Sequence, residues 1–186
     1  LYILSDDQYD AVERMRNGCI LCGDVGTGKS RTALYYYFKG CGGSFRDGEF
    51  VSMTKPKDLY IITTARKRDT HEWDSELSLL LLKRGDQNGP KVVVDSWNNI
   101  KKYKDVKNSF FIFDEQRLVG SGTWVKSFYR IARYNSWILL SATPGDKWMD
   151  YVAVFVANGF FRNKTEFVQN HVIQKAWVNH FEVDIA

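Results

Sequence analysis

The chain has 186 residues, 44% hydrophobic and 15% aromatic, which is enough to bury the core of one globular domain. Its 26 basic and 22 acidic residues give a net charge of only +4, so any nucleic-acid surface must be a local patch. No apolar run approaches the roughly 20 residues that span a bilayer, and no signal-peptide pattern opens the chain, so we expect a cytoplasmic protein and exclude a membrane-spanning one.

Short apolar runs recur along the chain and predict five strands, at residues 18–22, 59–63, 91–95, 110–114 and 137–141. Their hydrophobicity is continuous rather than alternating, which indicates strands buried on both faces of a parallel sheet. Helical spacing of apolar residues lies between the strands, for example at Trp124, Phe128 and Ile131. We therefore expect a doubly wound, mostly parallel α/β fold, with ligands beyond the carboxyl ends of the strands.

The chain contains an odd number of cysteines, Cys19, Cys22 and Cys41. Cys19 and Cys22 are three apart on a predicted strand, so they point to opposite faces and cannot jointly bind a metal ion. We interpret the cysteines as small buried apolar residues.

Residues 23–30 read Gly-Asp-Val-Gly-Thr-Gly-Lys-Ser, between the first strand and a helix-prone run, and predict a phosphate-binding loop. Glycines let the backbone curl so that N–H groups point inward, beside the positive end of the following helix. Lys29 can reach the β- and γ-phosphates, and the Ser30 hydroxyl can ligate Mg²⁺. A turn that only joins strand to helix needs no Lys-Ser after its last glycine. The candidate nucleotide-binding residues of the loop are Gly23, Gly26, Thr27, Gly28, Lys29 and Ser30.

A second chemical centre follows the strand at residues 110–114, where four large apolar residues lead into Asp114 and Glu115. Acidic residues at the end of a buried strand of this kind are expected to lie beside the phosphate loop. We expect Asp114 to hold Mg²⁺ through its water shell, and Glu115 to orient and polarise the attacking water. An acidic turn is the alternative for the pair alone, but its order after the loop favours catalysis.

The last predicted strand runs into Ser141-Ala142-Thr143-Pro144. The hydroxyls of Ser141 and Thr143 can bond the region of the acid pair and sense the γ-phosphate, which would couple the site to movement. By itself the segment is more typical of a plain turn.

Residues 23–30, 114–117 and 141–143 stand in the order of motifs I, II and III of superfamily 2 helicases and translocases, which the chain resembles. The resemblance extends to Gln8, placed where the family has its adenine-reading glutamine, and to residues 63–68, which look like motif Ia. The amino-acid sequence of these motifs is most similar to that of Swi/Snf-like ATPases, especially the compact versions carried by bacteriophages. Motif II departs from the usual pattern in having Gln116 and Arg117 after the acids.

The resemblance implies a RecA-like, ATP- and Mg²⁺-binding domain of a DNA helicase or translocase, with DNA a more natural partner than RNA. For a phage protein, the location would be the host cytoplasm. It also implies that Arg66, Lys67 and Arg68 contact the phosphate backbone of one nucleic-acid strand. A solvated basic helix start is the alternative interpretation of these three residues.

The family's ATPases contain two RecA-like lobes, and residues 146–186 are too short for a second one. We therefore expect residues 1–186 to be a single helicase ATP-binding domain, the first lobe of a longer protein, which needs the second lobe for full activity. A nucleotide-switched binding module with little turnover is the alternative function. Glu115 argues against it, because a pure switch needs no catalytic base.

Overall fold

A computed structural model describes residues 4–24, 26–45, 48–115, 122–142, 148–177 and 180–185. In chain order the elements are α1 (Asp6–Arg14), β1 (Ile20–Cys22), α2 (Lys29–Gly40), β2 (Leu59–Thr63), α3 (Ala65–Asp69), α4 (Glu72–Leu79), β3 (Val92–Ser96), the 3₁₀ helix η1 (Trp97–Tyr103), β4 (Phe110–Asp114), α5 (Thr123–Tyr134), β5 (Ser136–Ser141), the 3₁₀ helix η2 (Trp148–Tyr151), α6 (Val152–Ala157), α7 (Lys164–His171), β6 (Val172–Trp177) and β7 (His180–Ile185).

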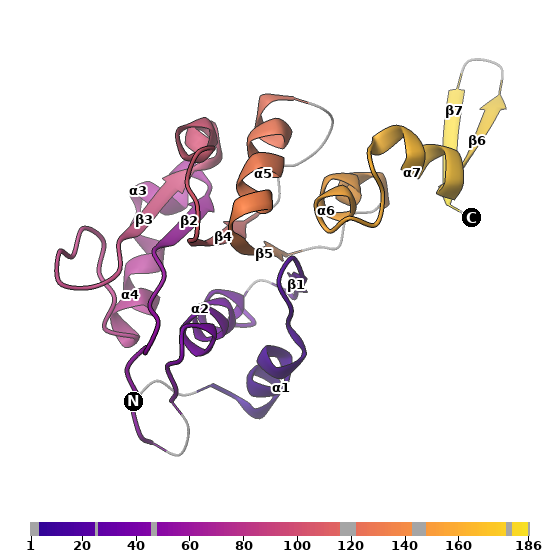
Figure 1. Cartoon of the computed structure of the whole chain (residues 1–186). Helices are drawn as coiled ribbons and strands as arrows, with labels where there is room; N and C mark the ends of the chain where they lie inside the picture. Colours follow the sequence, from indigo (N-terminus) through magenta and orange to yellow (C-terminus); the bar gives the residue numbers. More distant parts are fainter. Residues whose placement is uncertain are drawn as a thin grey trace.

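Strands β1 to β5 form one parallel sheet in the order β1-β5-β4-β2-β3. This confirms the predicted fold class. Figure 1 shows α1 and α2 on one side of the sheet and α5 on the other. The strand order matters for function, because β5 lies between β1 and β4, and β2 lies directly beside β4.

The two faces of the sheet bury two separate hydrophobic clusters. Phe110 and Ile112 of β4 pack with residues of α1, α2 and α4, whereas Phe111 and Phe113 pack with residues of η1, α5 and α6. All four side chains are nearly inaccessible to solvent. The continuous apolar run of β4 is therefore explained by burial on both faces, as expected for a parallel strand.

Strand ends differ from the sequence prediction by one or two residues. β1 begins at Ile20 instead of residue 18, because Gly18 takes a left-handed conformation with φ of 78°. The Gly18 N–H still donates to the carbonyl of Trp137 in the neighbouring strand, at 2.7 Å. β3 extends one residue further, to Ser96.

The interpretation of the cysteines as buried apolar residues is correct for Cys41 and wrong for Cys22. Cys41 lies against the core just after α2, whereas Cys22 is exposed at the end of a three-residue strand. Cys19 is intermediate. A strand this short, at the edge of the sheet, leaves its last residue without cover on one face.

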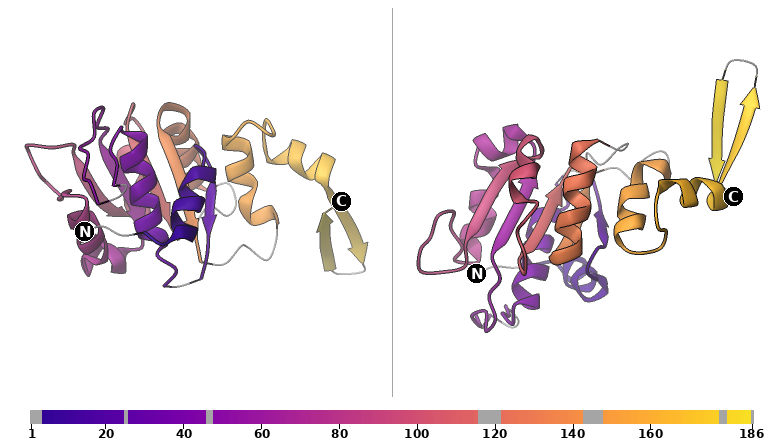
Figure 2. Two further views of the ribbon diagram at one scale, coloured as in Figure 1. Left: turned by 90° about the horizontal axis from the view of Figure 1, so that it is seen from below. Right: turned by 45° about the horizontal axis from the view of Figure 1, so that its top comes forward.

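The C-terminal elements extend away from one end of the sheet. In Figure 2, α6, α7 and the antiparallel pair β6–β7 follow one another outward from α5. Within the described residues, none of the helices has the length and apolar character needed to cross a lipid bilayer.

Candidate nucleotide-binding site

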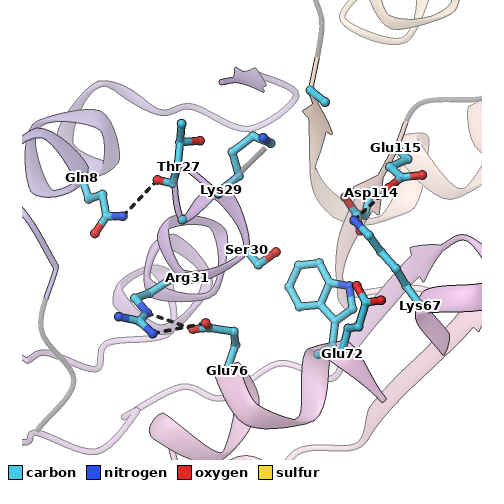
Figure 3. Close-up of a pocket in the computed structure, with 14 residues that line it drawn as sticks. Gln8, Thr27, Lys29, Ser30, Arg31, Lys67, Glu72, Glu76, Asp114 and Glu115 are labelled. Carbon is cyan, nitrogen blue, oxygen red and sulfur yellow. Dashed lines mark hydrogen bonds and ion pairs between the residues drawn. The ribbon is translucent and has the colours of Figure 1, made fainter. Parts of the chain in front are cut away.

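A pocket of about 570 Å³ lies beyond the carboxyl ends of β1 and β4. Figure 3 shows Lys29 and Ser30 on one side of it and Asp114, Glu115 and Lys67 on the other. Its lining residues are Gln8, Gly26, Thr27, Gly28, Lys29, Ser30, Arg31, Lys67, Glu72, Trp73, Glu76, Asp114, Glu115 and Ala142. The fold thus brings together segments that are up to 134 positions apart in the sequence, from Gln8 to Ala142.

The glycine-rich loop takes the backbone conformation that its sequence favours. Gly26 has a φ of 86°, and Gly28, the N-cap of α2, has a φ of 74°. These left-handed values are readily accessible only to glycine. Thr27 closes the turn by donating its N–H and its hydroxyl to the carbonyl of Asp24, at 3.3 and 2.9 Å. Val25 lies outside the described residues.

Gly23 also lies in tight surroundings. A Cβ at this position would come within 2.8 Å of the Thr27 hydroxyl oxygen. The Gly23 N–H donates to the carbonyl of Ser141 at 3.3 Å, which fastens the start of the loop to the end of β5. The loop therefore starts from a fixed point at the sheet.

Lys29 and Ser30 open α2 at the pocket. The Lys29 ammonium donates to the backbone carbonyls of Asp24, at 2.7 Å, and Gly23. No acidic residue stands in the first turn of α2, so the positive end of this helix is not neutralised locally and favours an anion. Ser30 is partly exposed to the pocket.

Gln8 connects α1 to the loop. Its side-chain oxygen accepts from the Ser5 N–H at 3.0 Å in a capping box, and its Nε2 donates to the Thr27 carbonyl at 3.2 Å. Gln8 lines the pocket, as its predicted contact with adenine requires. The adenine contact itself stays a prediction.

We predict that Gly28→Ala destabilises the chain and weakens nucleotide binding. A Cβ at Gly28 would lie 2.2 Å from Gln8 Nε2, and its φ of 74° would strain any other residue. The left-handed conformation alone costs roughly 1–2 kcal/mol. Gly40→Ala is the matched control, since a Cβ at Gly40, at the end of α2, meets nothing within 4 Å. Thermal unfolding and nucleotide titration measure both effects; equal behaviour of the two variants would contradict the prediction.

Asp114 is held at the end of β4 by groups from neighbouring elements. Its side chain is 5% exposed, and Oδ2 accepts from the Thr63 hydroxyl at 2.8 Å and from the Lys67 ammonium at 3.1 Å. Its backbone carbonyl accepts from Trp97 Nε1 at 2.9 Å. Thr63 is in reach because β2 pairs with β4, with Ile62 opposite Phe113.

Glu115 follows directly and has a φ of 56°, in the left-handed region that a non-glycine residue rarely takes. Its Oε1 lies 2.9 Å from the Lys67 ammonium, and its side chain is 37% exposed. Sparsely populated backbone conformations of this kind occur where the surrounding structure holds them, and they concentrate at functional sites. Asp114 and Glu115 both line the pocket.

The three basic residues of α3 have three different environments. Arg66 is exposed. Lys67 forms ion pairs with both acids of the pocket, and Arg68 forms ion pairs with Asp69 and Asp95. The sequence treats the three as one basic patch, but the structure turns Lys67 and Arg68 inward.

Arg68 belongs to a network around Asp95, at the end of β3. Asp95 accepts from the Ser96 N–H, from Asn99 Nδ2 at 2.8 Å, from the Tyr103 hydroxyl and from Arg68 at 3.1 Å. Burial opposes the ionised carboxyl, but these hydrogen bonds outweigh it and lower the pKa of Asp95. The network ties α3 to β3 and η1.

Sequence reasoning missed a second ion pair at the pocket. Arg31, directly after Ser30, forms a two-pronged contact with Glu76 of α4, at 2.9 and 3.2 Å. No local signal predicts this partner, which lies 45 positions away in the sequence. The pair joins the first turn of α2 to α4 along one wall of the pocket (Figure 3).

Ser141 and Thr143 were predicted to couple the site to movement. Ser141 ends β5 and is 7% exposed, and its carbonyl accepts from the start of the phosphate loop. Thr143, with residues 144–147, lies outside the described residues. Ser141 is therefore next to the loop, and the coupling role stays a prediction.

The donor set fits Mg²⁺ held jointly with a nucleotide. Ser30 and Asp114 supply oxygen atoms from opposite sides of one pocket, and Mg²⁺ is commonly bound by one or two protein groups together with substrate phosphates. In the described part of the chain, no group of three or more His, Cys, Asp or Glu side chains makes an all-protein metal site. The left-handed glycines and the uncompensated start of α2 fit the phosphates.

No protein-family model and no curated protein sequence matches this chain. Among solved structures, it is similar to the helicase domain of Hef from Pyrococcus furiosus, with a TM-score of 0.57 and 18% sequence identity. The match covers 82% of this chain and 36% of that one. The chain has the fold of a RecA-like helicase lobe. At this identity the similarity establishes the fold alone, and it does not support the Swi/Snf-like or phage resemblance.

Proposed function

We propose that the chain is the ATP-binding lobe of a nucleic-acid-dependent ATPase, a helicase or translocase that couples ATP hydrolysis to movement on DNA. The observation that carries the proposal is the pocket, in which a phosphate loop after β1 and an acid pair after β4 face each other. In the sheet β5 lies between β1 and β4, so the phosphate loop and the acid pair are two strand positions apart.

Each residue of the pocket would have a role that follows from the chemistry of its side chain. The loop N–H groups, Lys29 and the start of α2 would hold the phosphates, and Gln8 would contact the base. Ser30 and Asp114 would hold Mg²⁺, which supplies charge neutralisation at the phosphates when bound. Glu115 would accept a proton from the attacking water. Support for this division comes from the pocket, in which Lys29 and Ser30 lie on one side and Asp114 and Glu115 on the other (Figure 3).

The assignment to a subfamily, and to DNA as the substrate, rests on the amino-acid sequence of the motifs. The Swi/Snf-like and phage affinity, the preference for DNA, and a coupling role of Ser141 and Thr143 come from the motif resemblance. Exposed Arg66 is the member of α3 that fits a phosphate-backbone contact. The chain spans 36% of the length of the Hef structure, which is consistent with one lobe of a larger motor.

We predict that the 186-residue chain by itself binds ATP in the presence of Mg²⁺ but hydrolyses it poorly. Charge developing on the γ-phosphate needs a cation from the opposite side, and a donor supplied by a second lobe or in trans is worth roughly 10³-fold or more in rate. The measurement is steady-state ATPase activity of the chain, with and without DNA, beside that of a protein carrying both lobes.

Robust DNA-stimulated turnover by the chain alone, equal to that of the two-lobed protein, would show that the site is complete here. Absence of nucleotide binding would contradict the proposed function. Tight binding with no turnover even when the second lobe is present would favour the nucleotide-switched module instead.

A further inference from the structure

Lys67 lies in the proposed nucleotide site, although its sequence position places it in a basic segment. It is the third residue of α3, and Thr64 caps the helix by accepting the Lys67 N–H at 3.3 Å. The Lys67 ammonium is 2.9 Å from Glu115 and 3.1 Å from Asp114, and its side chain is 27% exposed. Two of the three N–H donors of this ammonium are therefore directed at the acid pair.

The immediate neighbours of Lys67 in the chain are basic. Arg66, Lys67 and Arg68 are consecutive in the five-residue helix α3. The carboxylates that compensate the charge of Lys67 are those of Asp114 and Glu115, at the end of β4. The position of the Lys67 ammonium is therefore tied to the acid pair.

The carboxylates of Asp114 and Glu115 in turn depend on Lys67 for a compensating charge. Asp114 is nearly buried, and besides Lys67 its carboxylate receives a hydrogen bond from the neutral Thr63 hydroxyl. A buried carboxylate left without a cation is strongly destabilising. Glu115 is held in a left-handed backbone conformation, with its carboxylate against the same ammonium.

We propose that Lys67 is a positioning residue of the nucleotide site, which orients Glu115 beside Asp114 and competes with Mg²⁺ for the Asp114 carboxylate. The inference rests on the proposed function, and it assigns Lys67 to the ATP pocket instead of to nucleic acid. A cation on the same oxygen atoms lowers their affinity for another cation by electrostatic repulsion. Loading of Mg²⁺ with a nucleotide therefore frees the Lys67 side chain from Asp114, which links the pocket to α3.

The first test is the Mg²⁺ dependence of nucleotide binding, measured by titrating a fluorescent ADP analogue at a series of Mg²⁺ concentrations. An opposite charge this close changes the proton affinity of a carboxyl by roughly tenfold or more, and we expect a comparable effect on Mg²⁺. Lys67→Met should therefore need about tenfold less Mg²⁺ for half-maximal nucleotide affinity. Lys67→Arg should restore most of the wild-type requirement, because it keeps the cation. Lys83→Met removes an exposed lysine elsewhere and is the matched control.

The second test uses Mg²⁺ alone and thermal unfolding. We expect Lys67→Met to unfold at a lower temperature than the wild type, since Asp114 loses its cation, and to recover most of the loss when Mg²⁺ is added. The wild type and Lys83→Met should respond little to Mg²⁺ alone. Should Lys67→Met be too unstable to purify, Lys67→Gln and Lys67→Arg supply the same comparison.

A Mg²⁺ requirement and Mg²⁺ response of Lys67→Met equal to those of the wild type would overturn the inference. So would a loss of DNA affinity in Lys67→Met as large as that in Arg66→Met, because Lys67 would then be a nucleic-acid contact. The proposed function fails separately, if the wild type shows no Mg²⁺-dependent nucleotide binding.

Discussion

Lys29→Ala should weaken ATP binding by at least about 100-fold, because the ammonium is the principal protein charge that compensates the β- and γ-phosphates. Its side chain reaches the carbonyls of Gly23 and Asp24, so it already lies across the phosphate loop. The measurement is a calorimetric titration of the chain with ATP and Mg²⁺.

Lys39→Ala is the matched control for this result. Lys39 lies in the last turn of the same helix, α2, and pairs on the surface with Glu13. An exposed pair of this kind contributes little, so we expect nucleotide affinity and stability close to wild type. Near wild-type affinity of Lys29→Ala would remove the loop from the nucleotide site.

Glu115→Gln should keep nucleotide affinity within about threefold of wild type and lower the hydrolysis rate by roughly 10²- to 10⁴-fold, the usual contribution of a general base. The amide keeps the shape of the side chain and can still accept a hydrogen bond from Lys67, but it cannot take a proton from water. Phosphate release is measured with nucleic acid and a second lobe present.

Glu49→Gln, at an exposed position outside the pocket, is the control for Glu115→Gln. Its rate should equal that of the wild type. If Glu115→Gln hydrolyses ATP at an unchanged rate, another base must be sought among the groups that line the pocket. Besides Asp114, the other carboxylates there are Glu72 and Glu76, and Glu76 is already paired with Arg31.

The fold was predictable because its signals are local. Residues 59–63 and 110–114 match the observed β2 and β4 residue by residue, since a strand buried on both faces leaves a continuous apolar run. The edge strand β1 was predicted less well, because the left-handed conformation of Gly18 delays the start of the regular strand to Ile20. The exposure of Cys22 was missed for a related reason, since cover by neighbouring elements has no local signature.

The sequence by itself determined which residues are the candidates for the chemistry of the pocket, and these residues do line it. Spacing along one loop specifies Lys29 and Ser30, and the end of one apolar strand specifies Asp114 and Glu115, so neither assignment needs long-range information. The tertiary structure decided which charged side chains form ion pairs with one another. Because β2 pairs with β4, Lys67 meets the acid pair, and because α3 packs beside β3, Arg68 meets Asp95. The charge of a side chain follows from its residue type. The charged group that it contacts depends on strand order, because strand order brings together residues that are far apart in the chain.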